Sequence, residues 1–166
     1  MIRAIFPAIL VAALALPASG AGATDLQILG LAGQHVTLTP ADVAARPHRT
    51  LTTTVEGKTL RFDGVPLSDL LQLVDAPQGK DLRGRGLCDM VLVSAADGYK
   101  VVLALAETDP LFRHDAVILA DRADGAPLIG TSGPYRLVVE GDQRGARLAR
   151  MVTEIRVLQL PDCAAR

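Results

Sequence analysis

The stretch Phe62-Asp63-Gly64-Val65-Pro66-Leu67-Ser68-Asp69-Leu70-Leu71 contains the pattern that decides the fold. Up to Phe62 the residues alternate as in a strand, and Gly64-Val65-Pro66 marks a change of element. Apolar residues then recur at helical spacing, at Leu67, Leu70, Leu71 and Val74. Pro77 lies beyond this run. The stretch therefore predicts a strand that leads directly into a short buried helix over 67–74.

Strands outnumber helices in the rest of the sequence. Alternating apolar and polar residues between turn residues predict strands over 26–31, 35–38, 49–55, 59–62, 87–95, 99–105, 116–121, 135–139 and 152–160. Thr39 before Pro40 predicts a second short helix, which Pro47 stops. Residues 121–125 predict a hairpin turn. Because the helices are too short for regular βαβ crossovers, we expect an α+β fold with a mixed, largely antiparallel sheet.

The first residues have the layout of a secretory signal peptide. Arg3 precedes the apolar run 4–16, and the small-residue site Ala21-Gly22-Ala23 follows it. A membrane anchor needs about 20 consecutive apolar residues, and this run is shorter. We therefore predict a signal peptide over 1–23, cleavage before Thr24, no stable membrane insertion afterwards, and a single domain over 24–166.

Composition excludes several classes of partner. The whole chain has a formal net charge of −1, and aromatic residues make up only 3% of it. A slightly acidic chain without tryptophan offers neither a basic surface nor stacking platforms for bases. We therefore expect no nucleic-acid binding.

Two cysteines, Cys88 and Cys163, remain after the predicted signal. In an oxidising compartment an even number of cysteines favours a disulfide, although sequence alone cannot fix the pairing. The alternative is two thiols that never meet. Their wide spacing matches neither a zinc site nor a redox Cys-x-x-Cys motif.

Three ordered stretches resemble the molybdopterin-binding domain of sulfite-oxidase-type oxidoreductases. The first carries TTTVEG at 52–57 and FDGVPLSDLL at 62–71, and the second carries SAADGY at 94–99. The third carries DGAPL at 124–128, GPYRLVV at 133–139 and GARLAR at 145–150. The resemblance covers most of residues 26–160. It implies the fold of that family and molybdopterin as the cofactor. It also implies that exported members carrying the cofactor use a twin-arginine signal, whereas this chain offers only Arg3.

The resemblance further implies where such a cofactor would lie. Catalytic members bind molybdenum through a cysteine thiolate in a Cys-Val-Glu-Gly context, and the matching residue here is Thr54. Ser132 takes the place of the family's histidine before Gly-Pro. The implied cofactor-binding positions are Thr54, Ser132, Gly145, Arg147 and Arg150, with no catalytic residue and no metal ligand among them. A threonine hydroxyl does not replace a soft thiolate on such a metal.

The sequence thus predicts a periplasmic or secreted protein that acts as a cofactor-free binding or accessory module. Two alternatives stay open: a small molybdopterin-dependent oxidoreductase, and a structural domain that contacts another exported protein. Glycine N–H groups and guanidinium groups in the loop 141–150 suit a small anion or a pterin-like ligand. We also expect the strand over 49–55 to carry the Thr54 side chain toward a polar cavity lined by residues 145–150.

Overall fold

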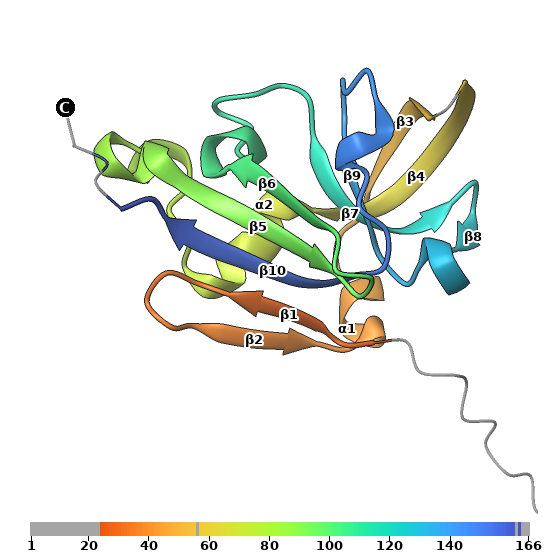
Figure 1. Cartoon of the computed structure of the whole chain (residues 1–166), viewed down its shortest axis with the longest axis horizontal. Helices are drawn as coiled ribbons and strands as arrows, with labels where there is room; N and C mark the ends of the chain where they lie inside the picture. Colours follow the sequence, from red (N-terminus) through yellow and green to blue (C-terminus); the bar gives the residue numbers. More distant parts are fainter. Residues whose placement is uncertain (1–23, 56, 162, 164–166) are drawn as a thin grey trace, which may run out of the picture.

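The computed structural model describes residues 24–55, 57–161 and 163. Within this part, the strands form two sheets that lie side by side (Figure 1). The predicted signal peptide over 1–23 and its cleavage site lie outside the described residues. Across the described residues, no helix is both long enough and apolar enough to cross a membrane.

The first sheet has the strand order β2-β1-β10-β5-β6. Its strands are β1 (Leu26–Leu29), β2 (His35–Leu38), β5 (Asp89–Ala95), β6 (Lys100–Ala104) and β10 (Val152–Gln159). The two hairpins, β1–β2 and β5–β6, are antiparallel, as local turns require. β1 pairs with β10 in parallel, which joins the two ends of the described chain in one sheet.

The second sheet is antiparallel throughout. Its strands are β3 (Arg49–Val55), β4 (Lys58–Pro66), β7 (Val117–Ala123), β8 (Ala126–Pro127) and β9 (Arg136–Val139). β3 lies at one end and pairs with β4, while β7 lies between β4 and β9. The mixed, largely antiparallel architecture expected from the sequence is therefore confirmed.

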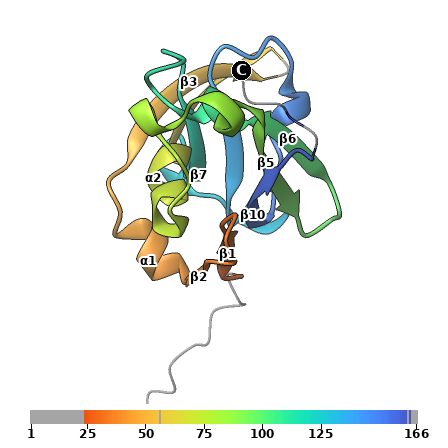
Figure 2. The ribbon, with the colours of Figure 1, turned by 90° about the vertical axis from the view of Figure 1, so that its left-hand side faces the viewer.

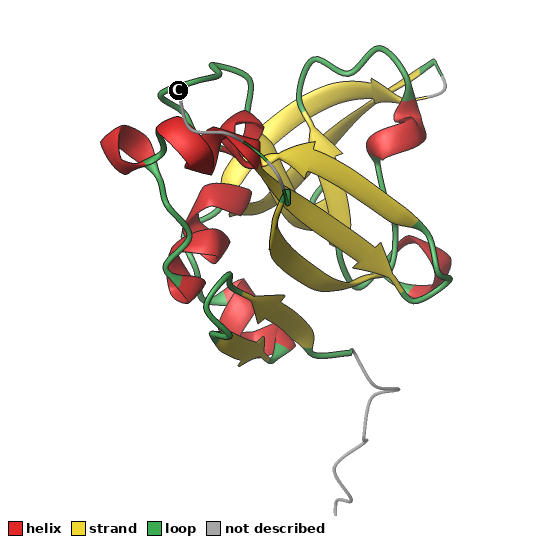
Figure 3. Ribbon diagram, turned by 60° about the vertical axis from the view of Figure 1, so that its left-hand side comes forward, coloured by secondary structure: helices red, strands yellow, loops and turns green. Residues whose placement is uncertain are grey.

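The helices are short, and most of them gather on one side of the sheets (Figure 3). They are α1 (Pro40–Ala44), α2 (Leu67–Leu71) and the 3-10 turns η1 (Gln72–Val74), η2 (Gly79–Asp81), η3 (Gly84–Cys88), η4 (Leu105–Thr108), η5 (Gly130–Ser132) and η6 (Gly145–Arg147). Thr39 caps α1, because its hydroxyl accepts from the Asp42 N–H while the Asp42 carboxylate accepts from the Thr39 N–H.

The stretch from Phe62 to Leu71 forms the strand and helix that the sequence predicts. Gly64 is required where β4 shifts its register against β7, since a Cβ there would collide with the backbone of Leu119. α2 then packs on β4 and β7 (Figure 2). Its apolar side chains are fully buried, so the predicted buried helix is confirmed.

Several predicted boundaries were wrong by a few residues. The strand expected over 87–95 begins at Asp89, because Gly84–Cys88 forms a 3-10 turn first. The helix expected over 67–74 is α-helical only to Leu71, and the 3-10 turn η1 completes it. β4 runs on to Pro66, four residues beyond the predicted end, because pairing with β7 extends it.

The apolar side chains form two clusters on opposite faces of the second sheet. The larger cluster fills the space between the sheets and α2, with members such as Val91, Ile155 and Leu119. The smaller cluster lies on the other face, around Phe62 and Ile118. Leu51 from β3 and Leu148 from the loop after β9 complete the smaller cluster. That loop is thereby held against the β3–β4 hairpin, next to the positions implied by the family resemblance.

Candidate functional site

A cavity of about 700 Å³ lies between β3 and the loop after β9. Its lining residues are Thr52, Thr53, Thr54, Gly57, Gly141, Asp142, Gln143, Arg144 and Gly145. The structure thus brings together two of the predicted positions, Thr54 and Gly145, which lie far apart in sequence. The wall opposite β3 is formed by residues 141–145 rather than by the predicted 145–150.

The three threonines do not share one face of the sheet. Thr53 pairs with Leu60 and lies on the same face as Leu51, which packs in the smaller apolar cluster. Thr54 therefore lies on the opposite face, where its Oγ1 is 3.3 Å from Oγ1 of Thr59. Thr53 and Thr54 thus lie on opposite faces of β3, and both line the cavity that the loop 141–145 borders.

The Arg147 guanidinium forms ion pairs with two carboxylates. Its Nε and Nη2 donate to the two Asp142 oxygens at 2.9 and 2.6 Å, and its Nη1 donates to Glu107 at 3.2 Å. The hydrogen bonds that Arg147 donates to Asp142, helped by the one to Glu107, hold the pKa of the Arg147 guanidinium above its ordinary value. Arg147 therefore fastens the loop to η4, and its charge is compensated within the protein.

Three other basic side chains line a second cavity, which shares Gly145 with the first. This cavity, of about 460 Å³, is lined by Lys58, Leu60, Arg136, Gly145, Ala146, Leu148 and Arg150. The Arg136 guanidinium lies over the Phe62 ring, 5.4 Å from its centroid. The predicted position Arg150 therefore faces a basic cavity together with Lys58 and Arg136, which the sequence did not single out.

The η6 turn between these cavities is held from the first sheet. The Tyr99 hydroxyl, which comes from the β5–β6 turn, donates to the Ala146 carbonyl at 2.6 Å. Tyr99, Ala146 and Arg150 also line a smaller cavity of about 220 Å³. Nothing in the local sequence around Tyr99 indicates this contact, because its partner lies on a distant loop.

Ser132 is not brought to either of the two larger cavities. It ends η5, which follows the β7–β8 hairpin, and its side chain is partly buried. The next residue, Gly133, lies so close to the Leu128 backbone that a Cβ would collide with the Leu128 carbonyl. The position implied by the resemblance is therefore separate from the cavity that contains Thr54.

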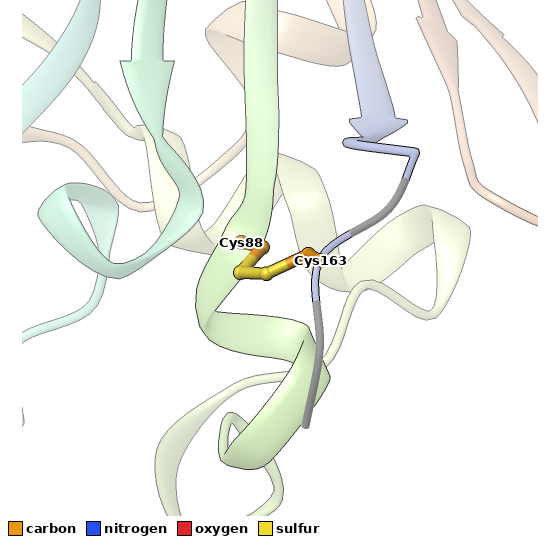
Figure 4. The surroundings of a disulfide bond; sticks show 2 residues. All are labelled: Cys88 and Cys163. Atoms are coloured by element: carbon orange, nitrogen blue, oxygen red, sulfur yellow. A yellow bond between two sulfur atoms is a disulfide. The ribbon is translucent and has the colours of Figure 1, made fainter. Parts of the chain in front are cut away.

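Cys88 and Cys163 are joined in a disulfide with a Cα–Cα distance of 6.3 Å (Figure 4). The bond links the start of β5 to the chain after β10, at the end of the molecule opposite the β3–β4 hairpin (Figure 1). The adjacent Asp89 is almost fully buried. Burial raises the pKa of its carboxyl group, against the opposing effects of a Gln159 hydrogen bond and the Arg85 charge.

The donor groups near Thr54 do not fit a molybdenum centre of the family type. The position at which the resemblance implies a thiolate is Thr54, whose hydroxyl lies 3.3 Å from Thr59 Oγ1. Both cysteines are used by the distant disulfide. Among the described residues, no group of three or more histidine, cysteine, aspartate or glutamate side chains is arranged to hold a metal ion.

Comparison with known proteins identifies the family. The family model of the oxidoreductase molybdopterin-binding domain matches residues 13–164. The chain therefore belongs to this family. The crystal structure of the sulfane dehydrogenase SoxCD from Paracoccus pantotrophus is similar, with a TM-score of 0.63 and 22% identity. That match covers 86% of this chain but 44% of the SoxCD chain, so this chain spans less than half of its length. A search of curated proteins found no match.

Proposed function

We propose that this protein is an exported binding or accessory module of the oxidoreductase molybdopterin-binding family, which works without the metal cofactor. The observation that carries the proposal is Thr54, a hydroxyl at the position of the metal-binding thiolate. Molybdenum in such sites needs a soft sulfur ligand, and a hydroxyl is a hard, weakly acidic group. The proposed compartment is the periplasm or the exterior, in keeping with the signal layout of residues 1–23.

We propose that the ligand is a small anion or a pterin-like molecule with an anionic group. The support is the basic cavity beside Gly145, whose lining includes Lys58, Arg136 and Arg150. The Arg150 guanidinium can bind phosphate-like oxygens through paired N–H donors, and the Lys58 ammonium adds a second charge. Arg147 is left out of this assignment, because Asp142 and Glu107 already hold it.

Metal analysis tests the cofactor-free role most directly. Residues 24–166 are expressed in the cytoplasm of a host that makes the cofactor, as the native sequence, as Thr54→Cys and as Thr52→Cys. Thr52 lies on the same face of β3, two residues away, and so provides a matched thiol control. We expect no molybdenum in the native sequence and the Thr52→Cys variant, and at most weak occupancy in Thr54→Cys. Stoichiometric molybdenum with oxidoreductase turnover in the native sequence would establish an enzyme instead.

Phosphate titration followed by amide NMR tests the anion site. Inorganic phosphate should shift the signals of Gly145 and Ala146, and Lys58→Ala together with Arg150→Ala should weaken this response. Lys80→Ala on η2 together with Arg83→Ala just before η3 serves as a control of equal charge change outside the cavity. If phosphate leaves the loop signals unchanged in the native protein, the structural interaction domain becomes the better assignment.

Intact-mass measurement tests export. The protein recovered from the periplasm or medium should begin at Thr24, because the small residues 21–23 suit signal peptidase. A mass that retains the apolar segment would mean that the segment acts as an anchor.

A further inference from the structure

β3 is an open edge of the second sheet. Its register with β4 runs without a break from Arg49↔Gly64 to Val55↔Lys58. In an antiparallel pair every second residue turns its N–H and C=O groups away from the partner strand. No backbone hydrogen bond from elsewhere in the described chain reaches these outward groups. β3 therefore presents a row of backbone donors and acceptors on its outer side.

The other edges of the two sheets are shorter or covered. β2 has four residues, β8 has two, and β6 has five and begins with Lys100. β9 receives a neighbouring segment, because its Leu137 N–H donates to the Ala149 carbonyl at 2.9 Å. Natural proteins protect sheet edges by short strands, lysine, proline or bulges. β3 has seven residues and none of these protections, which distinguishes it from the other edges.

The 700 Å³ cavity borders this same edge. Consecutive residues of a strand point to opposite faces, so a cavity lined by Thr52, Thr53 and Thr54 together reaches around the edge of β3. The loop 141–145 forms its other wall. An added strand would lie about 4.8 Å from β3. Every second side chain of that strand would then enter the space in front of the loop.

The charges around the edge favour an acidic occupant. Arg49, Lys58 and Arg144 form no ion pair with another described residue. Two described acids near the edge are already engaged: Asp63 accepts from the Thr50 hydroxyl and lies 3.6 Å from Arg61, and Asp142 pairs with Arg147. Among the described residues, positive charge without an ion-pair partner therefore lies on the strand, on the neighbouring strand and on the loop.

We propose that β3 binds an extended, acidic segment of a partner protein by strand addition. Main-chain hydrogen bonds to β3 supply affinity, and the cavity between β3 and the loop 141–145 accepts alternate side chains of the segment. Arg49, Lys58 and Arg144 select acidic residues on it. This interaction goes beyond the small-anion site and shares only one basic residue, Lys58, with it, because the occupant's backbone pairs with β3 rather than with the cavity beside Arg150.

Hydrogen–deuterium exchange resolved at single amides tests the proposal. The probe is a short peptide that alternates glutamate and valine, and its matched control has lysine in place of glutamate. With the acidic peptide, we expect alternate amides of β3 to exchange about tenfold more slowly, since they become hydrogen-bonded. Arg144→Glu should weaken peptide affinity about fivefold, whereas Arg83→Glu just before η3 should leave it unchanged. Both substitutions affect exposed side chains, so the fold is expected to persist.

The outcomes separate the possible occupants. Protection of β3 by the acidic peptide but not by the lysine peptide supports the proposal. Protection that grows with protein concentration in the absence of peptide would identify a second copy of this chain as the occupant and overturn it. Unchanged exchange in β3 at millimolar acidic peptide would overturn it as well. Phosphate binding at the Gly145 loop is read from different amides, so the two proposals can fail independently.

Discussion

Different interactions stabilise the space between the two sheets and the region around the β3–β4 hairpin. The first is filled by the larger apolar cluster, whose members come from both sheets and α2. The second has only the smaller cluster beneath it, and polar contacts such as Arg147 with Asp142 and Glu107 shape its loop. Apolar burial provides most of the stability of a domain, whereas exposed ion pairs add little.

Because of this difference, the family fold does not depend on the residues around Thr54. The inter-sheet core uses neither Thr54 nor the loop 141–150 apart from Ala149. Under the proposed function, a hydroxyl in place of a thiolate at Thr54 therefore removes a metal ligand without removing a core contact. The site can change its chemistry while the sheets keep their packing.

Loss of the disulfide should give the largest effect, although it lies far from the hairpin. The bond closes a sequence separation of 75 residues. In the chain-entropy model, releasing such a loop costs about 4 kcal/mol. We expect Cys88→Ser with Cys163→Ser to lower the denaturant midpoint strongly while leaving phosphate binding by the remaining folded protein unchanged. Thiol labelling of the denatured native protein without reductant provides the control, and two free thiols there would contradict the bond.

Truncation of one leucine in each cluster compares the two regions directly. Leu119→Ala, in the fully buried larger cluster, should lower the free energy of unfolding by about 3 kcal/mol, because close neighbours cannot fill the cavity left behind. Leu148→Ala, in the smaller cluster, should cost about 2 kcal/mol and also loosen the loop. Urea unfolding gives both values. Equal costs, with no change in exchange of the loop amides, would remove the distinction between the regions.

Alkaline pH should weaken the inter-sheet core through Tyr135. Burial, with Asp121 and other carboxylates nearby, raises the pKa of its phenol to about 12. The folded protein favours the neutral phenol. Its contribution to the free energy of unfolding is therefore complete below about pH 10, the pKa of the phenol in the unfolded chain, and is lost as pH rises toward about 12. The expected loss is about 2 kcal/mol.

Tyr135→Phe is the matched variant for this prediction. Its stability should not show that decline, and it should be as stable as the native protein near neutral pH, because the buried hydroxyl has no hydrogen-bond partner among the described residues. Thermal unfolding from pH 9 to 12 measures both proteins. Parallel pH profiles for the two would assign the alkaline loss to another group.

Removal of the loop ion pairs should have the smallest effect on stability. Arg147→Ala breaks partly exposed pairs with Asp142 and Glu107, which predicts a cost of about 1 kcal/mol. The same change should speed amide exchange in residues 141–147, since the loop loses its link to η4. Arg156→Ala provides a control, because Arg156 pairs with Glu154 on its own strand. A loss of stability as large as that of Leu119→Ala would show that the loop belongs to the main core.

The fold could be predicted from sequence to a large extent because its elements follow local rules. The Thr39 cap, the hairpin turn at Gly98 and the apolar spacing after Leu67 all act over a few residues. The ordered motifs also led to the correct family. Export, the cofactor-free role and the ligand remain predictions.

The candidate site could be predicted only in part. Sequence placed Thr54 and Gly145 at one cavity, and the structure brings them there. The sequence did not indicate that the Arg147 guanidinium donates a hydrogen bond to Glu107, which lies 40 residues earlier in the chain. It also missed Lys58, whose role depends on the register of the β3–β4 hairpin against a distant loop.

The sequence by itself determined the local pattern of strands, turns and short helices, and it placed a threonine where the family uses a thiolate. Side-chain alternation, capping and turn preference involve neighbours along the chain, so they can be deduced before any folding is known. Tertiary structure alone decided that β1 pairs with β10, that the loop 141–145 lies beside Thr54, and that β3 remains an open edge. These features depend on which distant segments pack together, and that choice minimises the exposed apolar surface of the whole chain rather than of any one stretch.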